Sequence, residues 1–260
     1  MADMIYAPLI EEMTWSYSRI ECFDDCPYKW FMKYIKELEE EPRFYSSYGT
    51  FMHSLIEKYL NGELKADELP LEFLVGFSEN VKGFRPKESI VQSYIDKGLD
   101  YLKNIEMFPF NTIAVEKKID FSVEGIQFTG IIDYIGERDG GLYIVDNKSR
   151  DLKPRSKRKK PTQKDEELDE MLKQLYIYSE GVRQEYGKLP KALCFNCFKA
   201  RTFIEEPFRE DKFEEAIDWA IRTINRIKNT TKFYCNLDFF RCSYLCGLNN
   251  ECCYYDMRDK

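Results

Sequence analysis

The chain has 260 residues, enough for one sizeable core, and its formal net charge is −7. It has no apolar run of about 18 residues, and Met1-Ala2-Asp3-Met4 lacks the features of a signal peptide, so we expect a cytoplasmic protein without a membrane span. The net negative charge argues against nucleic-acid binding over the whole protein surface. It is compatible with binding through a local basic segment. The 19 Phe and 18 Tyr exclude wholesale disorder.

The first 110 residues are predicted to be helical. Ser18 followed by Glu21 fits a capping box that opens a short helix. Cys26-Pro27 ends that helix and starts another, because proline is favoured at the first helical position. Helices are predicted over residues 28–35, 50–60 and, less regularly, 86–107.

The remainder alternates strands and helices. Strands are predicted at residues 112–121, 127–137, 142–148 and 192–198. Glu124-Gly125 and Asp139-Gly140 are predicted turns, because glycine tolerates positive φ. Helices are predicted from about residue 166 to 186 and along the amphipathic stretch 213–227. We therefore expect a single α/β domain with a helical part (1–110), a core (111–200), and a C-terminal helix and cysteine-rich segment (201–260).

Two of these strands carry the residues of greatest chemical interest. Asp133 lies in one strand, and Asp146, Asn147 and Lys148 end the next, which follows across the hairpin turn 138–141. Both carboxylates can therefore lie at one end of a sheet, where Mg²⁺ would bind their oxygens. The neighbouring ammonium could activate water or stabilise charge on a phosphorus centre. The alternative is an ordinary solvated sheet edge.

Three polar residues on predicted helices can support this pair. His53 is the only histidine and could be a structural residue or a metal ligand. Gln174 and Tyr178 are four residues apart on one helical face, which is either a plain exposed polar face or part of the site. A basic run follows the second strand and forms either a mobile loop or a phosphate contact; it comprises Lys153, Arg155, Lys157, Arg158, Lys159, Lys160 and Lys164.

In this order the motifs resemble a known family. They are Ser-Arg-Ile-x-x-x-x-x-Cys-Pro at 18–27, Gly-x-x-x-His at 49–53, Gly-x-x-Asp at 130–133, Asp-Asn-Lys at 146–148 and Gln-x-x-x-Tyr at 174–178. The chain resembles the PD-(D/E)XK nucleases of the RecB type, including the AddB nuclease domain and CRISPR-associated RecB-like exonucleases. Glu116 occupies a position where this family often has an acid.

The resemblance implies a mixed restriction-endonuclease-like sheet and a metal-dependent nuclease. His53, Asp133, Asp146 and the carbonyl of Asn147 would ligate Mg²⁺ or Mn²⁺, and Lys148 would activate the attacking water. Gln174 and Tyr178 would orient the site or contact the DNA backbone. We expect an exonuclease acting on single-stranded or processed DNA ends, and the alternative is a non-catalytic DNA-binding or assembly module. The sequence has no Walker A motif, so any helicase, like any CRISPR or recombination protein, would be a separate partner.

The cysteines suggest a second cofactor. Nine cysteines without a secretion signal favour reduced thiols or a metal site over disulfides. The resemblance implies a 4Fe-4S cluster that joins the two chain ends through Cys26, Cys242, Cys246 and Cys252. The spacing of Cys242 and Cys246 departs from the family by one residue, and Cys253, Cys235 and Cys22 are alternative ligands. Zinc binding and free thiols are the competing interpretations, and Cys194 and Cys197 are expected in the core because they point to opposite strand faces.

Overall fold

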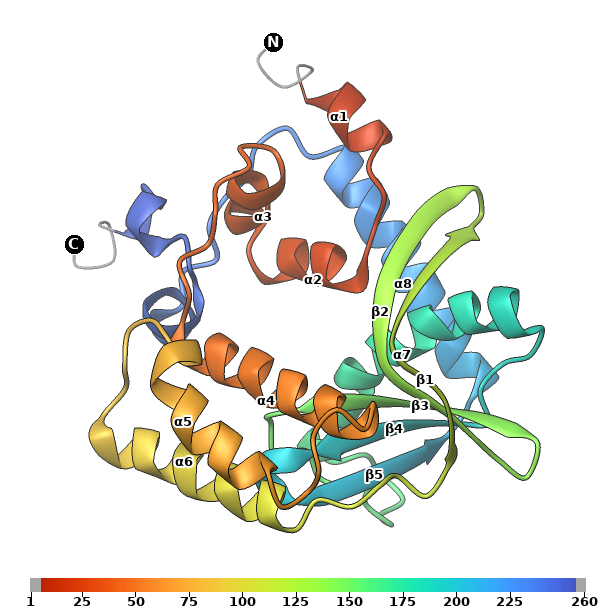
Figure 1. Ribbon diagram of the computed structural model, residues 1–260. Helices are drawn as coiled ribbons and strands as arrows, with labels where there is room; N and C mark the ends of the chain where they lie inside the picture. The colour runs from red at the N-terminus through yellow and green to blue at the C-terminus, as the bar shows by residue number, and fades with distance from the viewer. Residues whose placement is uncertain (1–5, 256–260) are drawn as a thin grey trace.

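A computed structural model describes residues 6–255 (Figure 1). Its helices are α1 (Ala7–Glu11), α2 (Tyr17–Asp25), α3 (Pro27–Tyr34), α4 (Phe44–Leu60), α5 (Leu69–Asn80), α6 (Glu88–Lys103), α7 (Gln163–Tyr186) and α8 (Glu210–Lys228). Its strands are β1 (Asn111–Val123), β2 (Ile126–Arg138), β3 (Gly141–Lys148), β4 (Ala192–Cys197) and β5 (Thr202–Pro207). Within the described residues, no helix is long and apolar enough to cross a membrane.

The five strands form one mixed sheet in the order β1-β2-β3-β4-β5. Only the β3–β4 pair is parallel. The connection between these two strands contains α7, which returns the chain to the end of the sheet where β3 began, so β4 runs in the same direction as β3. Both predicted turns are present, and each has two successive residues at positive φ, such as Asp139 at 52° and Gly140 at 72°. Two positive φ values match the twist of a two-residue hairpin, which explains the glycines. The expected α/β fold with a mixed sheet is confirmed.

Helices cover both faces of the sheet, so there are two hydrophobic cores. Residues of α7 and α8 share one core with one face of the strands, and residues of α4, α5 and α6 share the other with the opposite face. Cys194 belongs to the second core and Cys197 to the first, as expected from strand alternation. Neither thiol is therefore available for a chelating pair.

The helical N-terminal part differs from the prediction at several points. The cap of α2 is Ser16, whose side chain accepts a hydrogen bond from Arg19 N, so the predicted box at Ser18 and Glu21 is wrong. Cys26 caps α3 and Pro27 opens it, as predicted. α4 begins at Phe44, two turns before the predicted start, and α1, α5 and β5 were not predicted.

The C-terminal segment packs against the N-terminal helices, as Figure 1 shows beside α3 and α4. Tyr28 N donates to Tyr234 O at 3.1 Å, and the Arg241 guanidinium donates to Asp25 O at 2.7 Å. Further along, Glu41 N donates to Gly247 O at 2.9 Å. Hydrogen bonds from both backbone and side chains therefore join two distant parts of the sequence.

Candidate active site

The sheet opens where β2 and β3 separate. Their pairing runs from Arg138↔Gly141 to Tyr134↔Val145 and stops there. The next residue of β2, Asp133, replaces the missing backbone partner: its Oδ2 accepts a hydrogen bond from Asn147 N at 2.7 Å. A carboxylate thus enters the sheet at the point where the strands diverge. The side chain of Asn147 points elsewhere, with its Oδ1 accepting from Asn196 Nδ2 at 2.7 Å.

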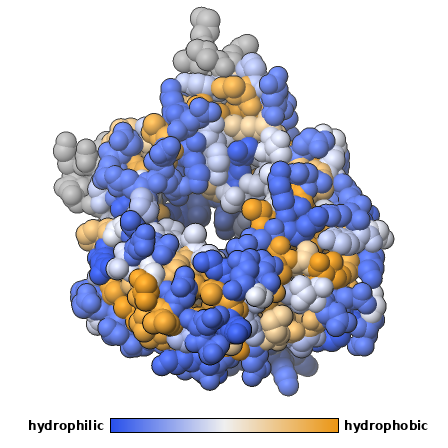
Figure 2. Space-filling view, viewed as in Figure 1, coloured by the Kyte–Doolittle hydropathy of each residue, from blue (hydrophilic) through white to orange (hydrophobic). Residues whose placement is uncertain are grey.

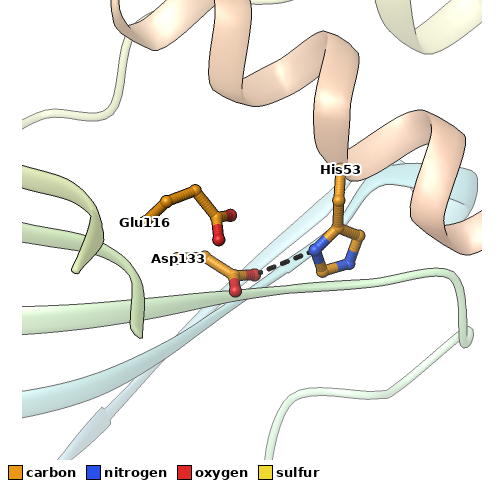
Figure 3. Close-up of side chains that lie close together, drawn as sticks. All are labelled: His53, Glu116 and Asp133. Atoms are coloured by element: carbon orange, nitrogen blue, oxygen red, sulfur yellow. Dashed lines mark ion pairs between the residues drawn. The ribbon is translucent and has the colours of Figure 1, made fainter. Parts of the chain in front are cut away.

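His53, Glu116 and Asp133 converge at this point (Figure 3). α4 directs His53 toward the sheet, and its Nδ1 lies 3.4 Å from Asp133 Oδ2. One ligand atom from each of the three residues lies within 4.8 Å of the others. Residues from a helix and two strands therefore present two carboxylates and an imidazole to one small volume.

Glu116 reaches this volume through an unusual backbone conformation. It lies within β1 with φ of 47°, a left-handed value that costs a residue with a Cβ about 1–3 kcal/mol. Such strain persists where the surrounding structure enforces it, often at functional sites. The predicted ligand set omitted Glu116, and only the family position hinted at it, because a local sequence pattern does not reveal one left-handed residue in a strand.

The carboxylates of this group resist ionisation. Burial, followed by the nearby Asp146 carboxylate, raises the pKa of Asp133 from 3.8 to about 6. Burial, followed by the Asp133 carboxylate, raises the pKa of Glu116 from 4.5 to about 7. Crowded acids without enough positive charge nearby behave in this way.

Asp146 and Lys148 lie on the α7 side of β3. Lys148 Nζ is 2.8 Å from Asp146 Oδ2 and donates a hydrogen bond to Gln174 Oε1 at 3.0 Å. Although Asp146 Oδ2 forms this ion pair, it receives no hydrogen bond of good geometry within residues 6–255. The carboxylate is buried, so one of its oxygens keeps spare capacity for an electropositive partner.

Tyr178 is buried against β2 instead of lying on an exposed face. A Cβ on Gly130 would lie 2.5 Å from Cε1 of the Tyr178 ring, so only glycine leaves room for it. Burial, followed by the charge of Asp146, raises the pKa of the Tyr178 phenol. The hydroxyl therefore stays protonated beside Gln174 and the two aspartates.

The donor set fits a hard divalent cation. Carboxylate oxygens with one imidazole nitrogen suit Mg²⁺ or Mn²⁺. The raised pKa values of Asp133 and Glu116 are signs of missing positive charge, which such an ion would supply. Asp146 lies beside the group formed by His53, Glu116 and Asp133 and is not part of it.

Six cysteines line a cavity of about 610 Å³ between the N-terminal helices and the C-terminal segment: Cys22, Cys26, Cys235, Cys242, Cys246 and Cys252. The predicted ligands Cys26, Cys242, Cys246 and Cys252 are all among them. Cys26 Sγ is also 3.7 Å from Cys235 Sγ. Cys253 is exposed and contacts the Tyr28 hydroxyl at 3.3 Å instead.

The same cavity also has a charged part. Its lining includes Glu21, Arg150 and Lys173 together with the cysteines. Figure 2 shows an opening near the middle of this face, between the N-terminal helices and the α4 layer of Figure 1.

The predicted basic run forms a loop whose ends are held together. The Asp165 carboxylate accepts hydrogen bonds from Ser156 and Thr162, which hold its pKa well below the usual range. Arg155 is neutralised by Asp169 and Glu206 at 2.6 and 2.7 Å. Residues 157–160 between the fastened ends are exposed.

Comparison with known proteins agrees with this fold. A provisionally assigned exonuclease from Eubacterium rectale aligns with a TM-score of 0.55 and 17% identity over 92% of this chain and 91% of its own. A second structure, SSO0001, covers 97% of both chains at 16% identity, but its TM-score of 0.30 is too low to support an argument. A search of curated proteins returned no significant match. The profile of the PD-(D/E)XK nuclease superfamily matches residues 14–253, and the chain therefore belongs to that superfamily.

Proposed function

We propose that this protein is a Mg²⁺- or Mn²⁺-dependent deoxyribonuclease that degrades DNA from single-stranded or processed ends. The observation that carries the proposal is the convergence of His53, Glu116, Asp133, Asp146 and Lys148 where β2 and β3 separate. Superfamily membership supports phosphodiester hydrolysis as the reaction.

Each residue has a chemical role in this proposal. His53, Asp133 and Asp146, with the Asn147 carbonyl as predicted and Glu116 added here, would hold the metal. A bound divalent ion supplies positive charge and Lewis acidity at the scissile phosphate. Lys148 donates hydrogen bonds to the attacking water and offsets charge that develops on the phosphate oxygens.

The remaining polar residues position this lysine. Its ammonium group is held between Asp146 and Gln174, so the orientation of the Lys148 side chain is fixed. The Tyr178 ring packs on the Gly130 backbone and fixes the helical face that carries Gln174. Gln174 and Tyr178 therefore orient the site, and contact with the DNA backbone is a second role open to them.

Cleavage of end-labelled DNA in Mn²⁺ tests the enzyme proposal. Lys148→Ala should slow degradation about 10²–10³-fold, which is about 3–4 kcal/mol of barrier. Asp146→Ala should be affected at least as strongly. Lys118→Ala is the matched control, because that lysine is exposed on β1 in a surface ion pair with Asp120. Undiminished degradation by the Asp146 and Lys148 variants would have to come from a contaminating nuclease, and would leave only the non-catalytic DNA-binding module for this protein.

Circular single-stranded DNA separates an exonuclease from an endonuclease. The central opening favours a substrate that enters by its end, so linear DNA should be degraded while the circle survives. Cutting of the circle at the linear rate would refute the exonuclease mode and leave the nuclease proposal standing.

We also propose that Cys26, Cys242, Cys246 and Cys252 bind a 4Fe-4S cluster. All four line one cavity, together with Cys22 and Cys235, and none of them forms a disulfide. Anaerobically purified protein should contain iron and acid-labile sulfide and lose its colour on reduction. Cys252→Ser should lose iron, whereas Cys253→Ser should keep it. Zinc without iron would instead identify a zinc site.

A further inference from the structure

The loop that joins α5 to α6 combines an exposed aromatic ring with three cationic side chains. Residues 82–87 read Lys-Gly-Phe-Arg-Pro-Lys and include no acid. Phe84 is 61% exposed, and Lys82, Arg85 and Lys87 are exposed as well. Across residues 6–255, none of these three cations has an ion pair or hydrogen bond. Their charges are therefore available to a ligand.

The loop is fixed in position. Gly83 has φ of 96°, and a Cβ there would lie 2.2 Å from Pro42 O and 2.7 Å from Arg43 Cα. Arg43 is buried and bonds to the side chain of Asn249 in the C-terminal segment. Because the backbone of the loop packs this closely, it holds the Phe84 ring outward at a defined place.

Phe84 is the outer member of a continuous row of rings. Its centroid is 5.8 Å from Tyr244, which is 5.3 Å from Phe240. Phe240 is 6.2 Å from Tyr45, which is 5.6 Å from Tyr94. All five rings are at least partly exposed. We call these five residues the aromatic row.

The inner end of the aromatic row, Tyr94, packs on the core beside α4. Lys199 Nζ donates to the Tyr94 hydroxyl at 3.4 Å and lies 4.7 Å from the ring centroid. Behind Tyr94 the buried rings of Tyr48 and Phe198 follow at 4.8 and 6.3 Å, and Phe198 is 6.1 Å from His53. Buried core rings therefore connect Tyr94, the inner end of the row, to His53.

We propose that the aromatic row, with Lys199 and the loop 82–87, binds single-stranded DNA outside the active site. The inference rests on the proposed nuclease function and names the strand that the site receives. Unpaired bases stack on aromatic rings without regard to sequence, and nearby cations contact the phosphates. Duplex bases are already stacked on each other, so they offer these rings no free face.

The unpaired cations favour DNA over a protein partner as the occupant. A different exposed apolar surface, on α5, consists of Leu71, Leu74 and Val75 and carries Glu72 among them. The row instead ends in three free positive charges on a protein of net charge −7. Charge complementarity with a polyanion is thus local to this surface.

Binding of fluorescent oligo(dT) in EDTA, where cleavage is blocked, tests the stacking contacts. Phe84→Ala and Tyr244→Ala should each weaken binding roughly five- to 150-fold, the range for loss of one stacked base. Leu71→Ala and Leu74→Ala remove exposed apolar side chains of α5 and should bind like wild type. Phe84→Trp keeps a stacking face and should restore binding, which separates stacking from a folding defect.

The salt dependence of the same binding tests the charges. Replacing Lys82, Arg85 and Lys87 together by Gln should lower the slope of log affinity against log salt by about 2, at about 0.7 per phosphate contact. A matched triple variant removes the same charge from exposed lysines outside the row: Lys118, Lys188 and Lys103. Its slope should stay at the wild-type value.

The outcomes separate this inference from the nuclease proposal. If Phe84→Ala and Tyr244→Ala bind oligo(dT) as tightly as wild type, the inference is overturned and the surface is left to a protein occupant. If wild type binds oligo(dT) through these residues but never cleaves DNA in Mn²⁺, the nuclease proposal fails while the binding surface stands.

Discussion

The stability of the metal-free protein should fall as pH rises, because of Asp133. Burial and the Asp146 carboxylate raise its pKa from 3.8 to about 6 in the folded state. A raised folded pKa contributes stability that is fully present below about pH 4 and is lost as pH rises through 6. At about 1.36 kcal/mol per pKa unit, the complete loss is about 3 kcal/mol. Glu116, with a pKa of about 7, acts in the same direction.

Urea denaturation in EDTA at pH 4.5 and pH 8 measures this term. About 2 kcal/mol of the Asp133 contribution to the free energy of unfolding is lost between these two pH values. The reference protein is Asp133→Asn, whose amide oxygen can still accept the hydrogen bond from Asn147 N. Wild type should lose about 2 kcal/mol relative to the variant on going to pH 8. Adding Mn²⁺ at pH 8 should then stabilise wild type and not the variant. Parallel pH profiles of the two proteins would refute the electrostatic account of the site.

Three further substitutions test individual contacts. Gly130→Ala should destabilise the protein by about 1–3 kcal/mol in chemical denaturation, because the added methyl group overpacks against the Tyr178 ring. Most of this loss should disappear when Tyr178 is also replaced by Ala, and additive effects of the two substitutions would contradict the close contact. Glu116→Gln should abolish most of the rise in melting temperature that Mn²⁺ gives wild type, and an unchanged rise would remove Glu116 from the metal site. Ser16→Ala should cost about 1 kcal/mol in thermal unfolding, whereas Ser18→Ala should stay within a few tenths, because Ser16 is the helix cap; the reverse order would reinstate the capping box.

The sequence predicted those elements whose signals are local. Strands β1 to β3 follow from apolar runs separated by Glu124-Gly125 and Asp139-Gly140, and α8 follows from a long 3.6-residue apolar period. The start of α4 was missed because Gly49 looks like a helix breaker, although it lies inside the helix. α5 was missed for a similar reason: it contains Gly76, whose absent side chain admits the Phe51 ring.

Pairwise geometry between distant residues depended on the fold. The sequence identified His53, Asp133, Asp146 and Lys148 as a set, but not that Asp146 pairs with Lys148 while Glu116 joins the imidazole. Likewise, the number of residues between Cys26 and Cys235 does not indicate that the two thiols lie close together.

The sequence by itself determined which chemical groups the chain offers and in what order, because turns, caps and periodicity act over a few residues. Only the tertiary structure decided which groups meet. The separation of β2 from β3, the left-handed backbone of Glu116 and the row of rings from Tyr94 to Phe84 each need contacts between segments far apart in the chain. Packing of whole helices and strands sets such contacts, so residue spacing does not encode them.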